Sequence, residues 1–184
     1  VKEIYRVGLP SIIMQSIGSV MTFGLNKILI SFTDTATAVF GAYFKLQSFI
    51  FMPVFGLNNG MVPVISYNYG AERLDRVRKT IKLTIGTAIC IMCIGFSAFQ
   101  LIPETLLNFF SPSEEMLSIG SLALRTISIH FPMAGFCIIA GSVCQAIGNP
   151  FYSLIVSVCR QLVVLLPAAW LLAQTGRLEL VWFA

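Results

Sequence analysis

The stretch that decides the fold runs from residue 53 to residue 82 and reads PVFGLNNGMVPVISYNYGAERLDRVRKTIK. Its first half is apolar but interrupted by proline and glycine. Membrane helices tolerate this combination because neighbouring helices and waters bond the freed backbone groups. Its second half holds five of the chain's twelve basic residues within ten positions. Such a cluster directly after an apolar helix is typical of the cytoplasmic edge of a membrane span. The stretch therefore predicts both membrane insertion and an orientation.

The composition of the whole chain also indicates a membrane protein. Of its 184 residues, 57% are hydrophobic and only 11% are charged, whereas a soluble domain carries about 25% charged residues. The net charge of +4 does not indicate a nucleic-acid partner, because the basic residues gather at predicted membrane edges. The chain begins with Val1 and stops at Ala184 inside an apolar run. We therefore expect it to be a piece of a longer polytopic protein.

The apolar stretches predict a series of membrane-spanning helices. A hydrocarbon core of about 30 Å needs about 20 apolar residues in a helix. The second predicted span is long enough to tilt or bend, and Pro53, Gly56, Gly60 and Pro63 are its expected bends. The fourth counts as one span although it contains Pro132. We predict an all-α polytopic membrane helix bundle with five full spans and the start of a sixth: residues 8–32, 36–69, 83–102, 116–147 and 151–173.

The charges between these spans predict the topology. Alternate links carry the basic residues, and the links between them carry acids only, so the N-terminal end is expected in the cytoplasm of a multi-pass plasma-membrane protein. Arg177 alone runs against this pattern. The basic flanks and links hold Lys2, Arg6, Arg73, Arg76, Arg78, Lys79, Lys82 and Arg160, and the acidic links hold Asp34, Glu104, Glu114 and Glu115. Within the spans, small residues such as Gly86, Gly95 and Gly135 predict close helix packing.

Several motifs resemble the C-terminal half of a multidrug and toxic compound extrusion (MATE) transporter. The most specific motif runs from Pro63 to Ala71 and contains the sequence SYNYGA. The resemblance also includes GLPS at residues 8–11, QAIGNP at residues 145–150, and Arg160 followed by Gln161. It covers nearly the whole chain.

The resemblance implies a twelve-helix protein built of two six-helix halves. Residues 1–184 would form the C-terminal lobe, truncated in its last helix, and the N-terminal lobe would be missing from this chain. The implied function is secondary active efflux of drugs or toxic compounds by H⁺ or Na⁺ antiport, with alternating access between the lobes. The sodium-coupled branch carries an acid in the first helix of this half, whereas residues 15–19 hold none here. The implied partners are small amphiphilic or cationic drugs, the lipid bilayer and the missing lobe.

No arrangement of residues in the sequence indicates an enzyme. All eight acids fall in predicted links or at span ends. Because intramembrane carboxylates usually carry the coupling cation, we expect that ion to bind in the missing half. No cofactor or metal site is predicted, since the pair Cys90 and Cys93 lies within a span without a second pair.

Besides Arg160, which is assigned to the nearby link between the fourth and fifth spans, three basic residues fall inside predicted spans. Lys27 lies near the outer end of the first span, and Arg125 lies about nine residues into the fourth. Lys45 lies roughly 13 Å deep in the second, at about 1.5 Å per residue. Buried charges are costly in a membrane and often mark a pathway. Together, these three residues predict a hydrated cavity that opens toward the outside of the cell. The alternative is that each side chain reaches the interface along its apolar stem.

The remaining candidates for the translocation path are polar or aromatic. His130 lies near mid-depth, where it could relay protons or instead bond a helix carbonyl. The phenylalanines at 40, 44, 51 and 55 follow one helical stripe, which suits varied amphiphilic substrates but also lipid contact or helix packing. The candidate amides, which either join helices or line a path, are Asn26, Gln47, Asn58, Asn59 and Gln145.

Two other functions were weighed against drug efflux. A lipid-linked oligosaccharide flippase of the same superfamily would use a basic cavity, which gives weight to Lys27, Lys45 and Arg125. A membrane scaffold or receptor has no feature of the sequence in its favour. The SYNYGA motif favours the exporter.

Overall fold

The computed structural model describes residues 2–174 and residue 182, and every regular element in this part of the chain is a helix. The all-α prediction is confirmed. The sixth predicted span falls almost entirely outside the described residues. In chain order the elements are α1 (Lys2–Ile30), α2 (Asp34–Gly70), α3 (Leu74–Leu101), α4 (Pro103–Asn108), α5 (Glu114–Ser128), α6 (Phe131–Ala146), α7 (Pro150–Val158), the π-helix η1 (Cys159–Leu165) and α8 (Leu166–Ala173).

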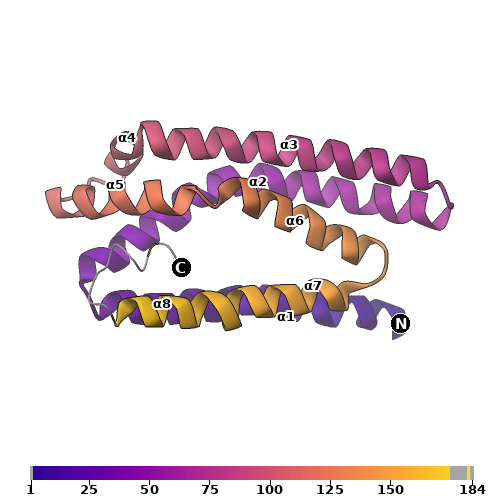
Figure 1. Ribbon diagram of the computed structural model, residues 1–184, viewed down its shortest axis with the longest axis horizontal. Coiled ribbons are helices and arrows are strands. Elements are labelled where there is room, and N and C mark those ends of the chain that lie inside the picture. Colours follow the sequence, from indigo (N-terminus) through magenta and orange to yellow (C-terminus); the bar gives the residue numbers. More distant parts are fainter. Residues whose placement is uncertain (1, 175–181, 183–184) are drawn as a thin grey trace.

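The helices form two layers (Figure 1). The lower layer consists of α1 and the continuous run of α7, η1 and α8, which pack against each other. The upper layer contains α3, α5, α6 and most of α2. Helix α2 rises from the lower layer into the upper one, and the link between α6 and α7 returns the chain at the opposite end. The two layers are therefore joined at both ends, with a space between them.

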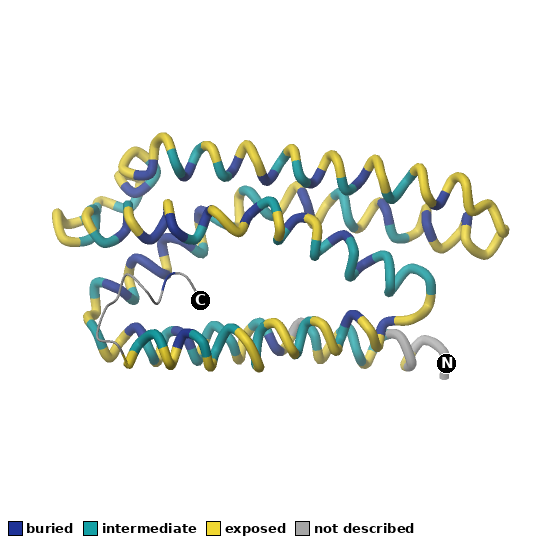
Figure 2. The backbone as a smooth tube through the Cα atoms, viewed as in Figure 1, coloured by how far each residue is buried: buried dark blue, intermediate teal, exposed yellow. Residues whose placement is uncertain are grey.

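Four helices of the described part are long and apolar enough to cross a membrane, and the bent pair of α5 and α6 raises this number to five. The described residues thus form a multi-pass membrane bundle. Buried residues gather between the helices of the upper layer (Figure 2). The outer faces expose large apolar side chains, including Phe23, Phe49 and Leu101. Lipid tails or other membrane-spanning helices can cover such faces.

Helix α2 remains one helix of 37 residues through both Pro53 and Pro63. Its N-terminus is capped by Thr33, whose Oγ1 accepts a hydrogen bond from the Ala36 N–H at 3.0 Å. At its other end, a turn leads directly into α3, which begins at Leu74. Most of the basic cluster therefore lies on the first turns of α3, and the prediction of a basic loop before the third span is wrong.

The fourth predicted span, over residues 116–147, consists of two helices that together are long and apolar enough to cross a membrane. Helices α5 and α6 are bent by 49° at the break around His130. Pro132 lies in the first turn of α6 and has no N–H for the Ser128 carbonyl. At the end of α5, Gln100 Nε2 of α3 donates to the Arg125 carbonyl at 2.8 Å and to Ser128 Oγ at 3.0 Å. A neighbouring helix thus bonds the last turn of α5, where Ser128 Oγ also donates to the Arg125 carbonyl.

The fifth predicted span is present, but its middle is a π-helix of seven residues. The π-helical turns end just before Pro167, which lies in the first turn of α8. Proline cannot donate to the carbonyl four residues earlier, and its ring crowds that carbonyl. A wider helical turn before the proline accommodates both effects. Pro167 therefore shifts the helical register and does not interrupt the span.

Glycines set the closest approaches between helices. A Cβ on Gly95 would lie 2.5 Å from Ile50 Cγ2 of α2, and one on Gly135 would lie 2.8 Å from Met92 Cγ of α3. These two confirm the predicted close packing. Gly86 does not, since no neighbouring heavy atom lies within 4 Å of its Cβ position.

Candidate functional site

A cavity of about 240 Å³ lies between the two layers. We call it the inter-layer cavity. It draws side chains from α1, α2, η1, the α5–α6 break and Trp182. Its lining residues are Met21, Leu25, Leu29, Phe40, Tyr43, Phe44, Gln47, Ile127, His130, Leu165 and Trp182.

Helical periodicity explains how two of its walls form. On α2, Phe40, Tyr43, Phe44 and Gln47 are separated by three or four residues and so share one face. The lining residues of α1 are likewise four apart. The rings of Phe40 and Phe44 meet edge to face, with their centroids 4.7 Å apart. Aromatic contacts of this kind hold the wall in place.

The chemistry of the inter-layer cavity is mainly apolar and aromatic. Gln47 and His130 contribute polar side chains, and no carboxylate is among the lining residues. Nor does any group of three His, Cys, Asp or Glu side chains in the described ranges have the arrangement of a metal site. The cavity can therefore hold an amphiphile by apolar contact and a few hydrogen bonds, but the described residues offer no anion to a bound cation.

The structure brings two of the predicted path residues together, since Gln47 and His130 both line the inter-layer cavity. Part of the predicted phenylalanine stripe lies there as well. The other part, Phe51 and Phe55, lies outside the cavity, and the Phe51 ring packs edge to face against Phe131 with centroids 5.5 Å apart.

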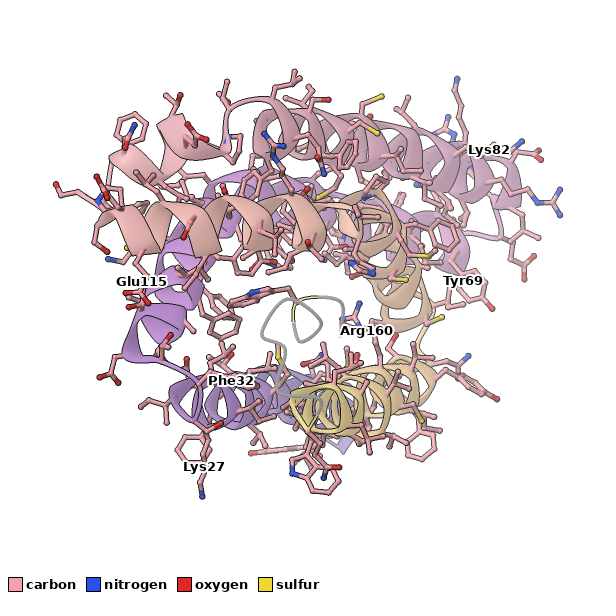
Figure 3. The ribbon with its side chains drawn as sticks, turned by 60° about the vertical axis from the view of Figure 1, so that its left-hand side comes forward. Lys27, Phe32, Tyr69, Lys82, Glu115 and Arg160 are labelled. Atoms are coloured by element: carbon pink, nitrogen blue, oxygen red, sulfur yellow. The ribbon has the colours of Figure 1, made fainter. Side chains whose placement is uncertain are left out.

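The three predicted intramembrane cations do not line the cavity. Lys27 points away from both layers (Figure 3). Lys45 lies with Nζ 5.6 Å from the centroid of the Phe110 ring, a cation–π contact near the end of α4. Arg125 is exposed on the last turn of α5. The structure therefore spreads these cations over separate surfaces of the bundle.

The other predicted amides are also dispersed. Asn26 is half-buried on α1, and Asn59 is exposed on α2. Asn58 Oδ1 is buried and has no hydrogen-bond partner among the described residues. Gln145 Nε2 lies 3.7 Å from Met14 Sδ, so it connects α6 to α1. These residues join or flank helices and do not line the inter-layer cavity.

Arg160 lies deeper in the bundle than the charge pattern predicts. That pattern places it at the edge of the link between the fourth and fifth spans. It actually lies on η1, ten residues after Pro150, which places it roughly 15 Å into the span at about 1.5 Å per residue. Its side chain points from the lower layer into the space between the layers (Figure 3). Counting residues from the Pro150 turn would have shown this depth.

An all-helical membrane bundle with a cavity between its layers has the architecture of a polytopic transport protein. The sequence profile of the MatE family matches residues 10–171. The chain belongs to this family, the multidrug and toxic compound extrusion transporters, as the resemblance indicated.

Individual relatives agree with this assignment. The chain is 23% identical to the multidrug export protein MepA of Staphylococcus haemolyticus over 98% of its own length. It is 22% identical to an FAD transporter of Shewanella oneidensis over 91% of its length. The solved structure of the MATE multidrug transporter DinF-BH in complex with R6G is 33% identical, with a TM-score of 0.86, and covers 99% of this chain and 41% of that one. The chain spans 40% of the length of MepA and 37% of that of the FAD transporter.

Proposed function

We propose that this chain acts as one lobe of a secondary active exporter of small amphiphilic molecules in the cell membrane. The observation that carries the proposal is the inter-layer cavity, whose wall is built from aromatic and flexible apolar side chains. Such surfaces adapt to substrates of different shapes. The multidrug relatives support the same function. The cavity is small beside ligand sites of about 300–1,000 Å³, which fits a site completed by a second lobe.

We propose that transport is driven by H⁺ or Na⁺ and that the cation binds in the other lobe. The acidic residues whose side chains the structure describes all lie at helix ends or in turns. They are Asp34, Glu72, Asp75, Glu104, Glu114 and Glu115. Intramembrane carboxylates are the usual cation carriers of such transporters, and this chain offers none in the inter-layer cavity. Asn59, Lys45 and Arg125 are exposed and remain proposed contacts of the second lobe.

Efflux from cells tests this function. The full-length transporter that contains this chain, and separately residues 1–184 alone, would be produced in an efflux-deficient bacterial strain. We expect the full-length protein to lower the accumulation of fluorescent amphiphilic dyes, and we expect dissipation of the proton or sodium gradient to abolish this effect. The isolated lobe should have no effect, because half of the site is missing. Accumulation equal to that in cells without the transporter, despite normal membrane levels, would refute the proposed export.

A further inference from the structure

The π-helix in the middle of the fifth span determines where Arg160 points. Successive residues turn less per step in a π-helix than in an α-helix, so residues five apart come back to nearly the same side. Arg160 and Leu165 are five apart, and Leu165 lines the inter-layer cavity. In an ordinary α-helix the same two residues would point about 140° apart, at 3.6 residues per turn. The π-helical turns therefore direct Arg160 to the side of the helix that faces the cavity.

Arg160 has no partner in the described part of the chain. No ion pair or hydrogen bond joins its guanidinium group to another described residue, and its side chain is exposed. An arginine side chain carries a positive charge. A charge at this depth is costly unless it is paired or serves a function. An arginine that points between the two layers is therefore available to bind an anionic group.

The inter-layer cavity and Arg160 together have the properties of an amphiphile site. Arg160 and Leu165 are about one π-helical turn apart, so the two side chains leave the helix on adjacent turns. An aromatic or aliphatic body in the cavity would place a head group within reach of the guanidinium. The described lining contains no carboxylate that could neutralise a cationic head.

We propose that Arg160 is the specificity-determining residue of this site and selects substrates that carry a carboxylate or phosphate head on an apolar body. Its planar donors bind both anions in a two-point geometry that a lysine cannot reproduce. This inference rests on the proposed function and narrows its substrate class. Anionic or zwitterionic amphiphiles, and not simple cations, would be the preferred cargo of this lobe.

Matched probes can test the proposal in the purified full-length transporter in lipid nanodiscs. Naphthaleneacetate, naphthaleneethanol and naphthylmethylammonium share one aromatic body and differ in the charge of the head group. Equilibrium dialysis would measure their Kd values. We expect the acetate to bind most tightly and the ammonium least tightly. The Arg160→Met variant should bind the acetate about tenfold more weakly, the value of one charge-assisted hydrogen bond, and should bind the alcohol as before.

Two further variants make the outcome decisive. Arg160→Lys keeps the charge and should retain a preference for the acetate, which also guards against a folding defect in Arg160→Met. Arg76→Met removes an arginine from the exposed first turns of α3 and should change none of the three affinities. The proposal is overturned if the wild type binds none of the probes, if it prefers the ammonium, or if Arg160→Met weakens all probes equally, as loss of a structural ion pair with the other lobe would. Continued dye export with any of these results would leave the proposed function standing.

Discussion

Ser66 and Asn68 show why a short motif can be specific for this fold. Ser66 Oγ donates a hydrogen bond to the Ala146 carbonyl at 2.8 Å, so it ties the end of α2 to the end of α6. Asn68 is buried and its Nδ2 donates to the Val64 carbonyl at 2.8 Å. The backbone N–H of Arg73 then donates to the Asn68 carbonyl at 2.9 Å and closes the turn before α3. The motif therefore ends one helix and anchors another.

Gln100 supports the break between α5 and α6, and its replacement should destabilise the protein. Gln100→Leu removes both hydrogen bonds from Nε2 to the end of α5, so that the Arg125 carbonyl keeps only the Ser128 hydroxyl as a side-chain donor. We expect the free energy of unfolding to fall by about 1–3 kcal/mol, measured as a lower apparent Tm of the full-length protein in detergent. In Ser97→Ala the lost hydroxyl bonded only the Cys93 carbonyl of its own helix, so the Tm should hardly change. Equal Tm values for both variants would contradict this role of Gln100.

At the scale of single residues, the sequence predicted part of the site. Gln47 and His130 were identified because polar side chains within spans are uncommon, and both line the inter-layer cavity. The aliphatic residues of α1 and Leu165 were not identified, because apolar side chains in a membrane span look alike whether they face lipid or a cavity. Only the packing of α1 against α2 and η1 distinguishes them. The depth of Arg160 in its span could be predicted from the sequence, but the direction of its side chain depends on the π-helix.

At the scale of helices, the packing of α2 against α3 depends on which face of α3 a glycine occupies. Gly86 and Gly95 are nine residues apart, about two and a half turns at 3.6 residues per turn. They therefore lie on opposite faces of the helix. Gly95 is buried against α2, whereas Gly86 is exposed. The composition of the span suggested that both would pack, and the helical period explains why only one does.

An alanine at Gly95 should weaken the contact between α2 and α3. Its Cβ would lie 2.5 Å from Ile50 Cγ2 and 2.9 Å from Cδ1, so Ile50 must change its rotamer or the helices must separate. We expect a loss of about 1–3 kcal/mol in the free energy of unfolding. Gly86→Ala is the matched control, and it should be neutral or slightly stabilising because alanine is the better helix former. Thermal unfolding in detergent compares the two, and a Gly95→Ala protein as stable as Gly86→Ala would disprove the close contact.

The helical spans themselves were predictable, whereas their irregularities were not. Length and hydropathy locate apolar segments because the bilayer thickness imposes a minimum length. The end of α5 at the 49° bend is bonded by Gln100, which lies on a different helix and cannot be paired with it from the sequence alone. Pro53 and Pro63, by contrast, leave α2 as a single helix. A proline in the sequence therefore indicates a possible bend, and tertiary contacts decide whether the helix breaks.

At the scale of the whole molecule, the basic cluster after the α2–α3 turn and the acidic start of α5 lie at opposite ends of the bundle. Lys82 lies toward the end with the α2–α3 turn, and Glu115 lies toward the opposite end (Figure 3). At that acidic end, Thr35 Oγ1 donates to Glu115 Oε2 at 3.2 Å and joins the start of α2 to α5. The alternation of basic and acidic links predicts that these two ends lie on opposite faces of the membrane.

This separation predicts the orientation of the protein, which cysteine labelling can measure. In full-length protein without the five native cysteines of this chain, one cysteine would replace Arg76 and, in a second variant, Glu114. Both residues are exposed, so access depends on the side of the membrane and not on packing. Basic residues stay on the cytoplasmic side during insertion. A membrane-impermeant maleimide added to intact cells should therefore label the Glu114 position and leave the Arg76 position unlabelled until the cells are permeabilised. The reverse pattern would contradict this orientation, because it would place the turn between α2 and α3 outside the cell.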